Sequence, residues 1–117
     1  MRVLIAGGRN FTDRDFLYKY MSKFLGEVTV VISGTAKGAD RLGEKWATDN
    51  GIEVERYPAQ WGRYGSKAGP IRNREMLEKG KPDLVVVFKG GRGSDHMATI
   101  SRKAGVKVYR PRKGLNE

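Results

Sequence analysis

The chain has 117 residues, the size of one domain and too short for two. It carries 23 lysines and arginines against 13 acidic residues, and the resulting charge of +10 favours polyanionic partners such as nucleotides or nucleic acid. Cysteine is absent, which excludes disulfides and thiolate metal sites. The longest apolar run, Leu84 to Phe88, is far shorter than the ~20 residues that span a bilayer. We therefore expect a cytoplasmic protein without a membrane partner.

Short strands and helices are predicted to alternate along the chain. Apolar or β-branched runs predict the strands, and apolar residues at helical spacing predict the helices. In chain order these are a strand at 2–6, a helix at 13–25, a strand at 28–32, a helix from 39 that Asn50-Gly51 closes, a strand at 52–57, a helix at 70–78, a strand at 83–88, a helix at 95–104 and a strand at 106–109.

Individual residues predict where these elements begin and end. Thr12 is the expected N-cap of the first helix, with Asp15 completing a capping box. Residues 58–69 are predicted to form a loop, and Pro70 to occupy the first position of the helix that follows. Residues 1–109 then form one domain, and residues 110–117 form a basic C-terminal tail that is expected to fray.

This alternation predicts an α/β fold of the Rossmann-like, doubly wound type. Strand–helix–strand units favour a parallel sheet, and right-handed crossovers then favour five strands in the order 3-2-1-4-5 with helices on both faces. Three of the strands run into glycine loops that precede helices, at residues 7–8, 34–38 and 90–94. All three loops are expected at the carboxyl edge of the sheet, where such folds bind ligands.

The glycine loops predict a site for a phosphate-bearing ligand. Glycine lets backbone N–H groups approach an anion, and a helix N-terminus adds unpaired donors and partial positive charge. The 90–94 loop suits this role best, because Ser94 could both cap the helix and donate to a phosphate. Neither the 34–38 loop nor the 90–94 loop is a P-loop or a Gly-x-Gly-x-x-Gly fingerprint. No His/Asp/Glu cluster suggests a metal site, and no cofactor is predicted.

Polar side chains near the loops add further candidates. Arg72 offers the planar fork that suits phosphate, and Asn73 either bonds a base or ribose or caps locally. Arg9 and Asn10 follow the first strand at the expected switch point, and Asp40 either caps its helix or holds ribose hydroxyls. The candidate ligand-binding residues are Gly7, Gly8, Arg9, Asn10, Gly34, Thr35, Gly38, Asp40, Arg72, Asn73, Gly90, Gly91, Gly93 and Ser94.

Three ring-bearing side chains have competing interpretations. Trp61 and Tyr64 lie in a basic segment and either stack a nucleic-acid base or pack over a helix, and packing is the favoured interpretation. His96, the single histidine, is expected to be solvated in the first helical turn rather than to act as an acid or base.

Four segments in order carry a resemblance to a known family. They are residues 2–13, Ser33-Gly-Thr-Ala-Lys-Gly-Ala-Asp40, Gly69-Pro-Ile-Arg-Asn-Arg-Glu-Met76 and Lys89-Gly-Gly-Arg-Gly-Ser94. Together they resemble the YspA / YpsA-related branch of the SLOG superfamily, over residues 1 to about 109. That superfamily has a Rossmann-like fold and also contains the Lonely-Guy-type phosphoribohydrolases and the DNA-processing protein DprA. The resemblance implies a nucleotide-derived ligand at the glycine loops, in a bacterial or phage protein, and a homo-oligomer.

One position departs from the phosphoribohydrolase pattern. Those enzymes have Pro-Gly-Gly-x-Gly-Thr-x-x-Glu after the fourth strand, and Met97 stands where their catalytic Glu would be. Asp95 should point elsewhere, because it lies about 200° around the helix from Met97. The resemblance therefore carries over binding more safely than catalysis, and the catalytic residues stay unassigned.

Two functions follow from these observations. The first is binding of a nucleotide or nucleotide-derived ligand, to sense it or to process it as a hydrolase or transferase. The alternative is a single-stranded nucleic-acid-binding module of the DprA type, supported by the charge, by Trp61 and Tyr64, and by the basic tail.

Overall fold

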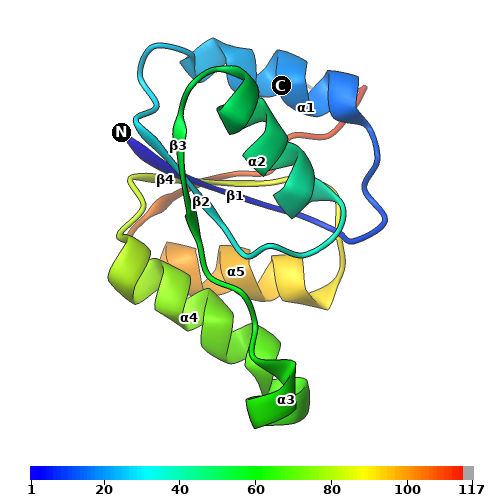
Figure 1. The fold of residues 1–117 in the computed structure, drawn as a ribbon, viewed down its shortest axis with the longest axis vertical. Helices are drawn as coiled ribbons and strands as arrows, with labels where there is room; N and C mark the ends of the chain where they lie inside the picture. Colours follow the sequence, from blue (N-terminus) through cyan, green and yellow to red (C-terminus); the bar gives the residue numbers. More distant parts are fainter. Residues whose placement is uncertain (115–117) are drawn as a thin grey trace.

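The five strands form one parallel sheet that lies between two groups of helices (Figure 1). A computed structural model describes residues 1–114. The strands are β1 (Arg2–Ala6), β2 (Val30–Ser33), β3 (Glu53–Arg56), β4 (Leu84–Val87) and β5 (Lys107–Tyr109). Their order is β3-β2-β1-β4-β5, and every neighbouring pair is parallel. The predicted doubly wound α/β fold and its strand order are confirmed.

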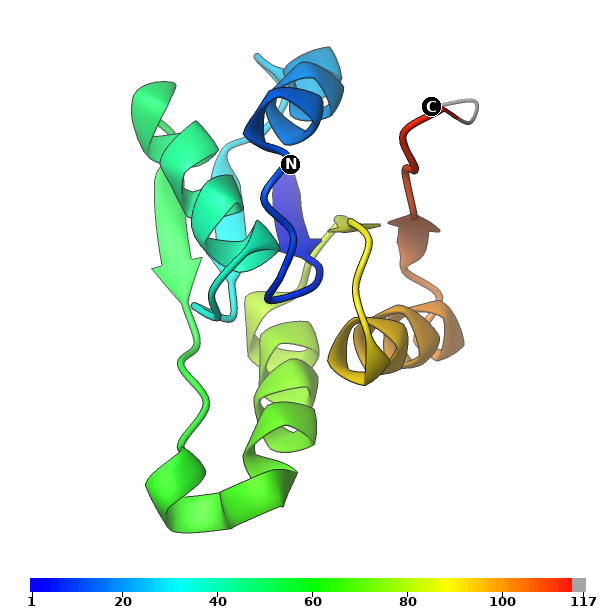
Figure 2. The same cartoon turned by 90° about the vertical axis from the view of Figure 1, so that its right-hand side faces the viewer.

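Two helices cover one face of the sheet, and two cover the other (Figures 1 and 2). On the first face lie α1 (Arg14–Met21), which continues as the short 3-10 helix η1 (Ser22–Phe24), and α2 (Ala39–Asp49). On the second lie α4 (Ala68–Gly80) and α5 (Arg92–Lys103). The short helix α3 (Trp61–Tyr64) and the 3-10 turn η2 (Gly65–Lys67) form an arm that extends past the start of α4. No helix within residues 1–114 is long and apolar enough to cross a bilayer.

Alternation along β1 separates the two hydrophobic cores. Val3 and Ile5 belong to the core under α1 and α2, whereas Leu4 and Ala6 belong to the core under α4 and α5. This is the pattern expected of a central strand that is buried on both faces, because successive side chains point to opposite sides. The rings of Phe11, Phe16 and Tyr20 surround Phe88 at centroid distances of 5.3, 6.0 and 5.9 Å.

Several element boundaries differ from those predicted. The N-cap of α1 is Asp13 and not Thr12, because the Asp13 carboxylate accepts from the Phe16 N–H (3.1 Å) and an ionised acceptor suits a helix N-terminus better than a hydroxyl. Residues 58–69 are not one loop, since they contain α3 and η2, and Pro70 is the third residue of α4 rather than the first.

Helix α4 ends at Gly80, two residues beyond the range predicted from the sequence. Gly80 is the last helical residue, and the left-handed position is occupied by Lys81, with φ of 47°. A Cβ at Gly80 would lie 3.2 Å from Cδ1 of Ile32, so the glycine lets α4 approach β2 closely. Glycine is needed at this position for close packing of the helix on the sheet and not for a turn.

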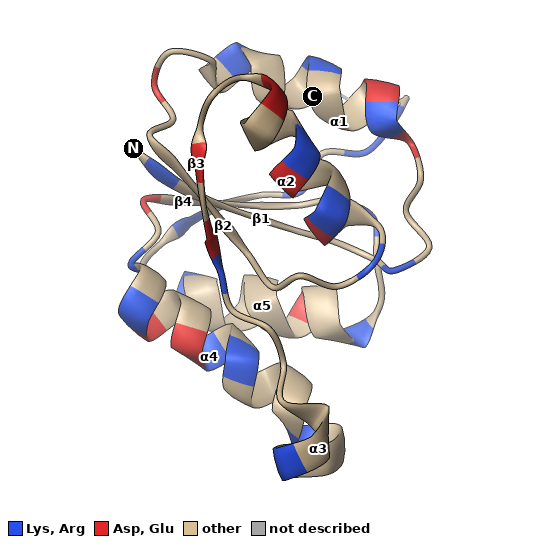
Figure 3. Ribbon diagram, viewed as in Figure 1, with Lys and Arg blue, Asp and Glu red and all other residues tan. Residues whose placement is uncertain are grey.

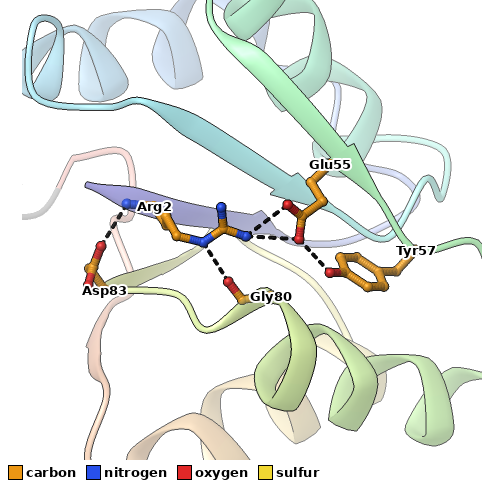
Figure 4. A network of polar contacts seen from close by, with 5 residues as sticks. All are labelled: Arg2, Glu55, Tyr57, Gly80 and Asp83. Carbon is orange, nitrogen blue, oxygen red and sulfur yellow. Dashed lines mark hydrogen bonds and ion pairs between the residues drawn. The ribbon is translucent and has the colours of Figure 1, made fainter.

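A polar network anchors this end of α4 to the sheet (Figure 4). Arg2 donates from Nε to the Gly80 carbonyl (2.7 Å) and from Nη2 to both carboxylate oxygens of Glu55 (2.8 and 2.9 Å). The Tyr57 hydroxyl also donates to Glu55, and these hydrogen bonds, first from Tyr57 and then from Arg2, lower the pKa of that carboxyl. The network joins β1, β3 and the C-terminus of α4, and so it fixes the helix that carries Arg72.

The described part of the basic tail packs against the domain instead of fraying. Pro111 is buried, Arg112 donates from Nη1 to the Val87 carbonyl (3.1 Å), and the Lys113 ammonium contacts Asp13 at 3.1 Å. These contacts bring the tail across the end of β4 to the start of α1. Residues 115–117 of the predicted tail lie outside the described part of the chain.

Candidate functional site

A cleft of about 1440 Å³ opens at the carboxyl edge of the sheet. Its base is formed where the loops after β1 and β4 meet: the Gly8 N–H donates to the Lys89 carbonyl (2.9 Å). Glycine is required at this contact, because a Cβ at Gly8 would lie 2.8 Å from Cα of Gly90. The loop after β2, the starts of α1 and α2, the N-terminal parts of α4 and α5, the α3 arm and the described tail form the rest of the lining.

Eleven of the fourteen candidate residues line this cleft, and three do not. The eleven are Gly7, Gly8, Arg9, Asn10, Asp40, Arg72, Asn73, Gly90, Gly91, Gly93 and Ser94. Gly34, Thr35 and Gly38 are not among the lining residues, although they belong to a glycine loop at the same edge of the sheet.

Two backbone donors of the 34–38 loop bond within the protein. The Thr35 N–H donates to the Ser33 hydroxyl (3.0 Å), and the Ala36 N–H donates to the Asp40 carboxylate (3.1 Å). Gly38 has a φ of +83°, and a Cβ there would lie 2.1 Å from the Gly8 carbonyl oxygen. These contacts join the loop to the start of α2 and to the β1 loop, and Ala36 is the residue of this loop that lines the cleft.

The N-terminus of α5, by contrast, is open to the cleft. Its N-cap is Gly91, and no side chain caps it. A Cβ at Gly91 or Gly93 would meet nothing within 4 Å, so the space in front of both residues is free. Ser94, the predicted cap, is instead a buried residue of the first turn, because the helix begins at Arg92 and not at Asp95. Free first-turn N–H groups and the helix dipole make this end suitable for an anion.

A buried carboxylate and a guanidinium lie together behind the open helix end. Asp40 is 6% exposed, and burial raises the pKa of its carboxyl to about 6, against the opposing effects of the Ala36 N–H and the Arg72 charge. Arg72 donates from Nη1 to the Gly34 carbonyl. A Cβ at Gly34 would lie 2.6 Å from that nitrogen and 2.9 Å from Oδ2 of Asp40, so glycine lets both side chains approach the end of β2.

We expect Asp40→Asn to gain stability relative to the wild type as the pH rises from about 4 to about 7. The folded-state pKa of about 6 exceeds the ordinary 3.8, so the native state keeps this proton to higher pH than the unfolded chain does, and the wild type loses stability across that window. The variant carries no such charge, and its free energy of unfolding should gain about 2–3 kcal/mol on the wild type.

Urea unfolding of both proteins across this pH range measures the difference. Other titrating groups, His96 included, are present in both proteins and largely cancel. A difference in free energy that does not change with pH would show that the Asp40 carboxyl ionises in the folded protein as easily as in water.

Asn73 and His96 are joined in a chain of contacts between α4 and α5. Asn73 is 5% exposed; its Oδ1 accepts from Nε of Arg72 (3.1 Å), and its Nδ2 donates to the Gly93 carbonyl (3.2 Å). Because an arginine Nε–H can only donate, this contact orients the amide, and Nδ2 is the atom 3.1 Å from Nδ1 of His96. Nδ1 is then the acceptor, and the proton of the neutral ring lies on Nε2.

His96 is therefore not the solvated residue predicted from the sequence. It is partly buried, it lines the cleft, and burial, followed by the charge of Arg74, lowers its pKa below 6.5. The neutral ring is held by Asn73 and leaves one N–H donor. The sequence contains no signal for this contact, because the two residues are 23 positions apart and on different helices.

Neither Met97 nor Asp95 places a carboxylate on the cleft lining. Met97 is 1% exposed and lies in the core under α4 and α5, although it also lines the floor of the cleft. Asp95 accepts from Arg110 (2.7 Å) and is not among the lining residues, in line with the helical spacing. The carboxylates that line the cleft are Asp13 and Asp40. Within residues 1–114 no group of three acidic or histidine side chains could hold a metal ion.

Positive charge predominates on the cleft lining. Six cationic side chains line it, namely Arg9, Arg72, Lys89, Arg92, Arg112 and Lys113, against the two carboxylates. Of the basic residues between Arg56 and Lys81, Arg72 lines the cleft. Arg56 lies on β3 and pairs with Glu44 (2.8 Å), and Figure 3 shows acidic residues beside basic ones along α4. The tail contributes two of the six.

The two aromatic residues of the arm have different surroundings. Trp61 is 47% exposed and lines the cleft, with the Arg9 guanidinium 5.4 Å from its ring centroid. Tyr64 is half-buried, has Arg63 over its ring at 5.0 Å, and does not line the cleft.

Two comparisons with known proteins agree with this architecture. The sequence profile of the "YspA, cpYpsA-related SLOG family" matches residues 1–64, which include the loops after β1 and β2 and reach the arm. The "Gene 61 protein" of Mycobacterium phage D29 is 36% identical over an alignment of 117 positions, which covers 92% of this chain and 93% of that protein. The chain belongs to the YspA, cpYpsA-related SLOG family.

Proposed function

We propose that the protein binds a nucleotide or nucleotide-derived ligand in this cleft, to sense it or to process it. The observation that carries the proposal is the uncapped N-terminus of α5, which opens into a cleft lined by six cations and two carboxylates. Backbone N–H groups, a helix dipole and an arginine fork are the groups that recognise phosphate in proteins. Family membership supports a nucleotide-related ligand and nothing narrower.

Binding is better supported than turnover. Cleavage of a glycosidic bond builds positive charge on the ribose, and a carboxylate stabilises that charge. The thioether of Met97 cannot do so, and Asp95 is engaged with Arg110 outside the cleft. Asp40 is the deeply buried carboxylate of the lining, and it is held by the Ala36 N–H.

A second candidate is the binding of single-stranded nucleic acid. It is favoured by the exposed ring of Trp61 among cations and by the size of the cleft, which exceeds the roughly 300–1,000 Å³ of ordinary small-molecule sites. In that case the logarithm of the binding constant for an oligonucleotide should fall linearly with the logarithm of the salt concentration. The slope is set by the number of phosphates contacted. Weak oligonucleotide binding at ~150 mM salt would show that the basic surface attracts nucleic acid only nonspecifically.

The first test of the nucleotide proposal is Gly91→Val. We expect it to abolish binding of AMP, ADP and ATP in calorimetry while the melting temperature stays close to that of the wild type. The side chain would fill the open space before the first turn of α5, and it meets no protein atom within 4 Å. The φ of Gly91, −111°, is accessible to any L-residue.

Gly62→Val is the matched control, because Gly62 has equally open surroundings and lies outside the cleft lining. It should bind these nucleotides as the wild type does. A well-folded Gly91→Val protein with unchanged affinity would remove this helix end from the site.

A further inference from the structure

We infer that Trp61 holds the base of the ligand by stacking, while the N-terminus of α5 holds its phosphates. The inference rests on the proposed function and adds an orientation and a specificity-determining residue to it. The two groups lie on different walls of one cleft: Trp61 on the α3 arm, and Gly91 on the loop after β4.

Among the described residues that line the cleft, Trp61 is the aromatic residue whose ring is not used by the core. Phe11 and Phe16 also line it, but both pack on Phe88. The ring of Trp61 contacts the backbone at the start of α4, where a Cβ on Gly69 would lie 3.4 Å from its Cη2. With 47% of its surface exposed, Trp61 keeps about half of its surface free of packing contacts.

Arg9, which also lines the cleft, lies beside the Trp61 ring. It follows β1 directly, it is exposed, and its guanidinium lies 5.4 Å from the Trp61 ring centroid. An exposed cation–π contact of this kind is weak, so a planar base can replace it or stack beside it. The displaced guanidinium would still lie in the cleft, where it can pair with a phosphate.

Tyr64 provides an internal comparison on the same four-residue helix. It is aromatic and has an arginine over its ring, as Trp61 does, but it does not line the cleft. A base bound in the cleft should therefore depend on Trp61 and not on Tyr64.

The test compares a probe with a base and a probe without one. Binding of the four common ribonucleoside diphosphates and of inorganic pyrophosphate is measured by calorimetry for the wild type, Trp61→Ala and Tyr64→Ala. We expect the affinity of Trp61→Ala for the best nucleoside diphosphate to fall roughly 5- to 150-fold. Its affinity for pyrophosphate should not change, and Tyr64→Ala should match the wild type with both probes.

Tryptophan fluorescence gives an independent readout. The chain has two tryptophans, and Trp46 is 1% exposed in the core. The nucleoside diphosphate should quench the wild type and not Trp61→Phe, which retains only Trp46. An unchanged nucleotide affinity in Trp61→Ala would overturn the stacking inference and leave the proposed function intact. So would a loss of pyrophosphate affinity in this variant as large as its loss of nucleotide affinity. A wild type that binds neither kind of probe would overturn both.

Discussion

Gly38→Ala is expected to destabilise the protein by roughly 3–5 kcal/mol, the largest effect of any single methyl group that we foresee. The added carbon would lie 2.1 Å from the carbonyl oxygen of Gly8 and 2.7 Å from that of Arg9, and neither backbone can move freely. That Gly8 carbonyl accepts from the Ala39 and Phe11 N–H groups (both 3.2 Å). The backbone φ of +83° adds strain for any L-residue. Urea unfolding monitored by circular dichroism measures the loss.

Gly51→Ala separates strain from collision. Gly51 also has a positive φ, +68°, but a Cβ there would meet nothing within 4 Å. Its cost should be the conformational term alone, about 1–2 kcal/mol. If Gly38→Ala and Gly51→Ala lose the same free energy of unfolding, then the loops after β1 and β2 are not in close contact. Gly38 would in that case be free to contact a ligand.

Arg72→Ala is expected to weaken nucleotide binding by about 10- to 150-fold, the equivalent of 1.5–3 kcal/mol. Arg72 places a guanidinium in the cleft, fixed by hydrogen bonds to the Gly34 carbonyl and to Asn73. A phosphate bound at α5 would lose a charged partner. The Asp40 carboxyl would lose a cation that opposes the rise in its pKa, so more of it would be protonated at neutral pH.

Arg74→Ala is the matched control for this variant. Arg74 lies two positions along α4, is exposed, and is absent from the cleft lining. Its removal takes away the same charge, so it should affect nucleotide affinity only through long-range attraction, which ~150 mM salt largely screens. Calorimetry with ADP on both variants decides. Equal losses of affinity in the two variants would mean that the overall charge of the protein attracts the ligand, and not the Arg72 guanidinium held in the cleft.

Some features of this protein can be predicted from short stretches of its sequence. The run Val3-Leu4-Ile5-Ala6 predicts a strand buried on both faces, and that prediction needs nothing beyond the run itself. Because each of the first four strands is followed by a helix, a parallel sheet is expected, and right-handed crossovers restrict its order to a few doubly wound arrangements. The carboxyl ends of such strands must meet at one edge, and this is why most of the candidate residues line one cleft.

The two longer glycine loops show where local patterns stop being informative. Gly34–Gly38 and Gly90–Ser94 are both glycine-rich segments that join a strand to a helix, so the sequence predicts the same anion-binding role for each. In the structure the first loop donates to Ser33 and Asp40 and packs against Gly8, while the second leaves its helix end open. That difference depends on what lies across from each loop, which no spacing within the loop records.

The same reason applies to side chains whose surroundings the sequence could not predict. The positions of Trp61, His96 and Arg112 in the cleft depend on an arm, a helix pair and a tail whose contacts join residues far apart in the chain. The sequence by itself determined the five strands, the four long helices, the sheet and the edge at which the cleft lies. Only the tertiary structure decided which backbone donors at that edge remain unpaired and which rings and cations face them, because burial and hydrogen-bond partners are set by long-range packing.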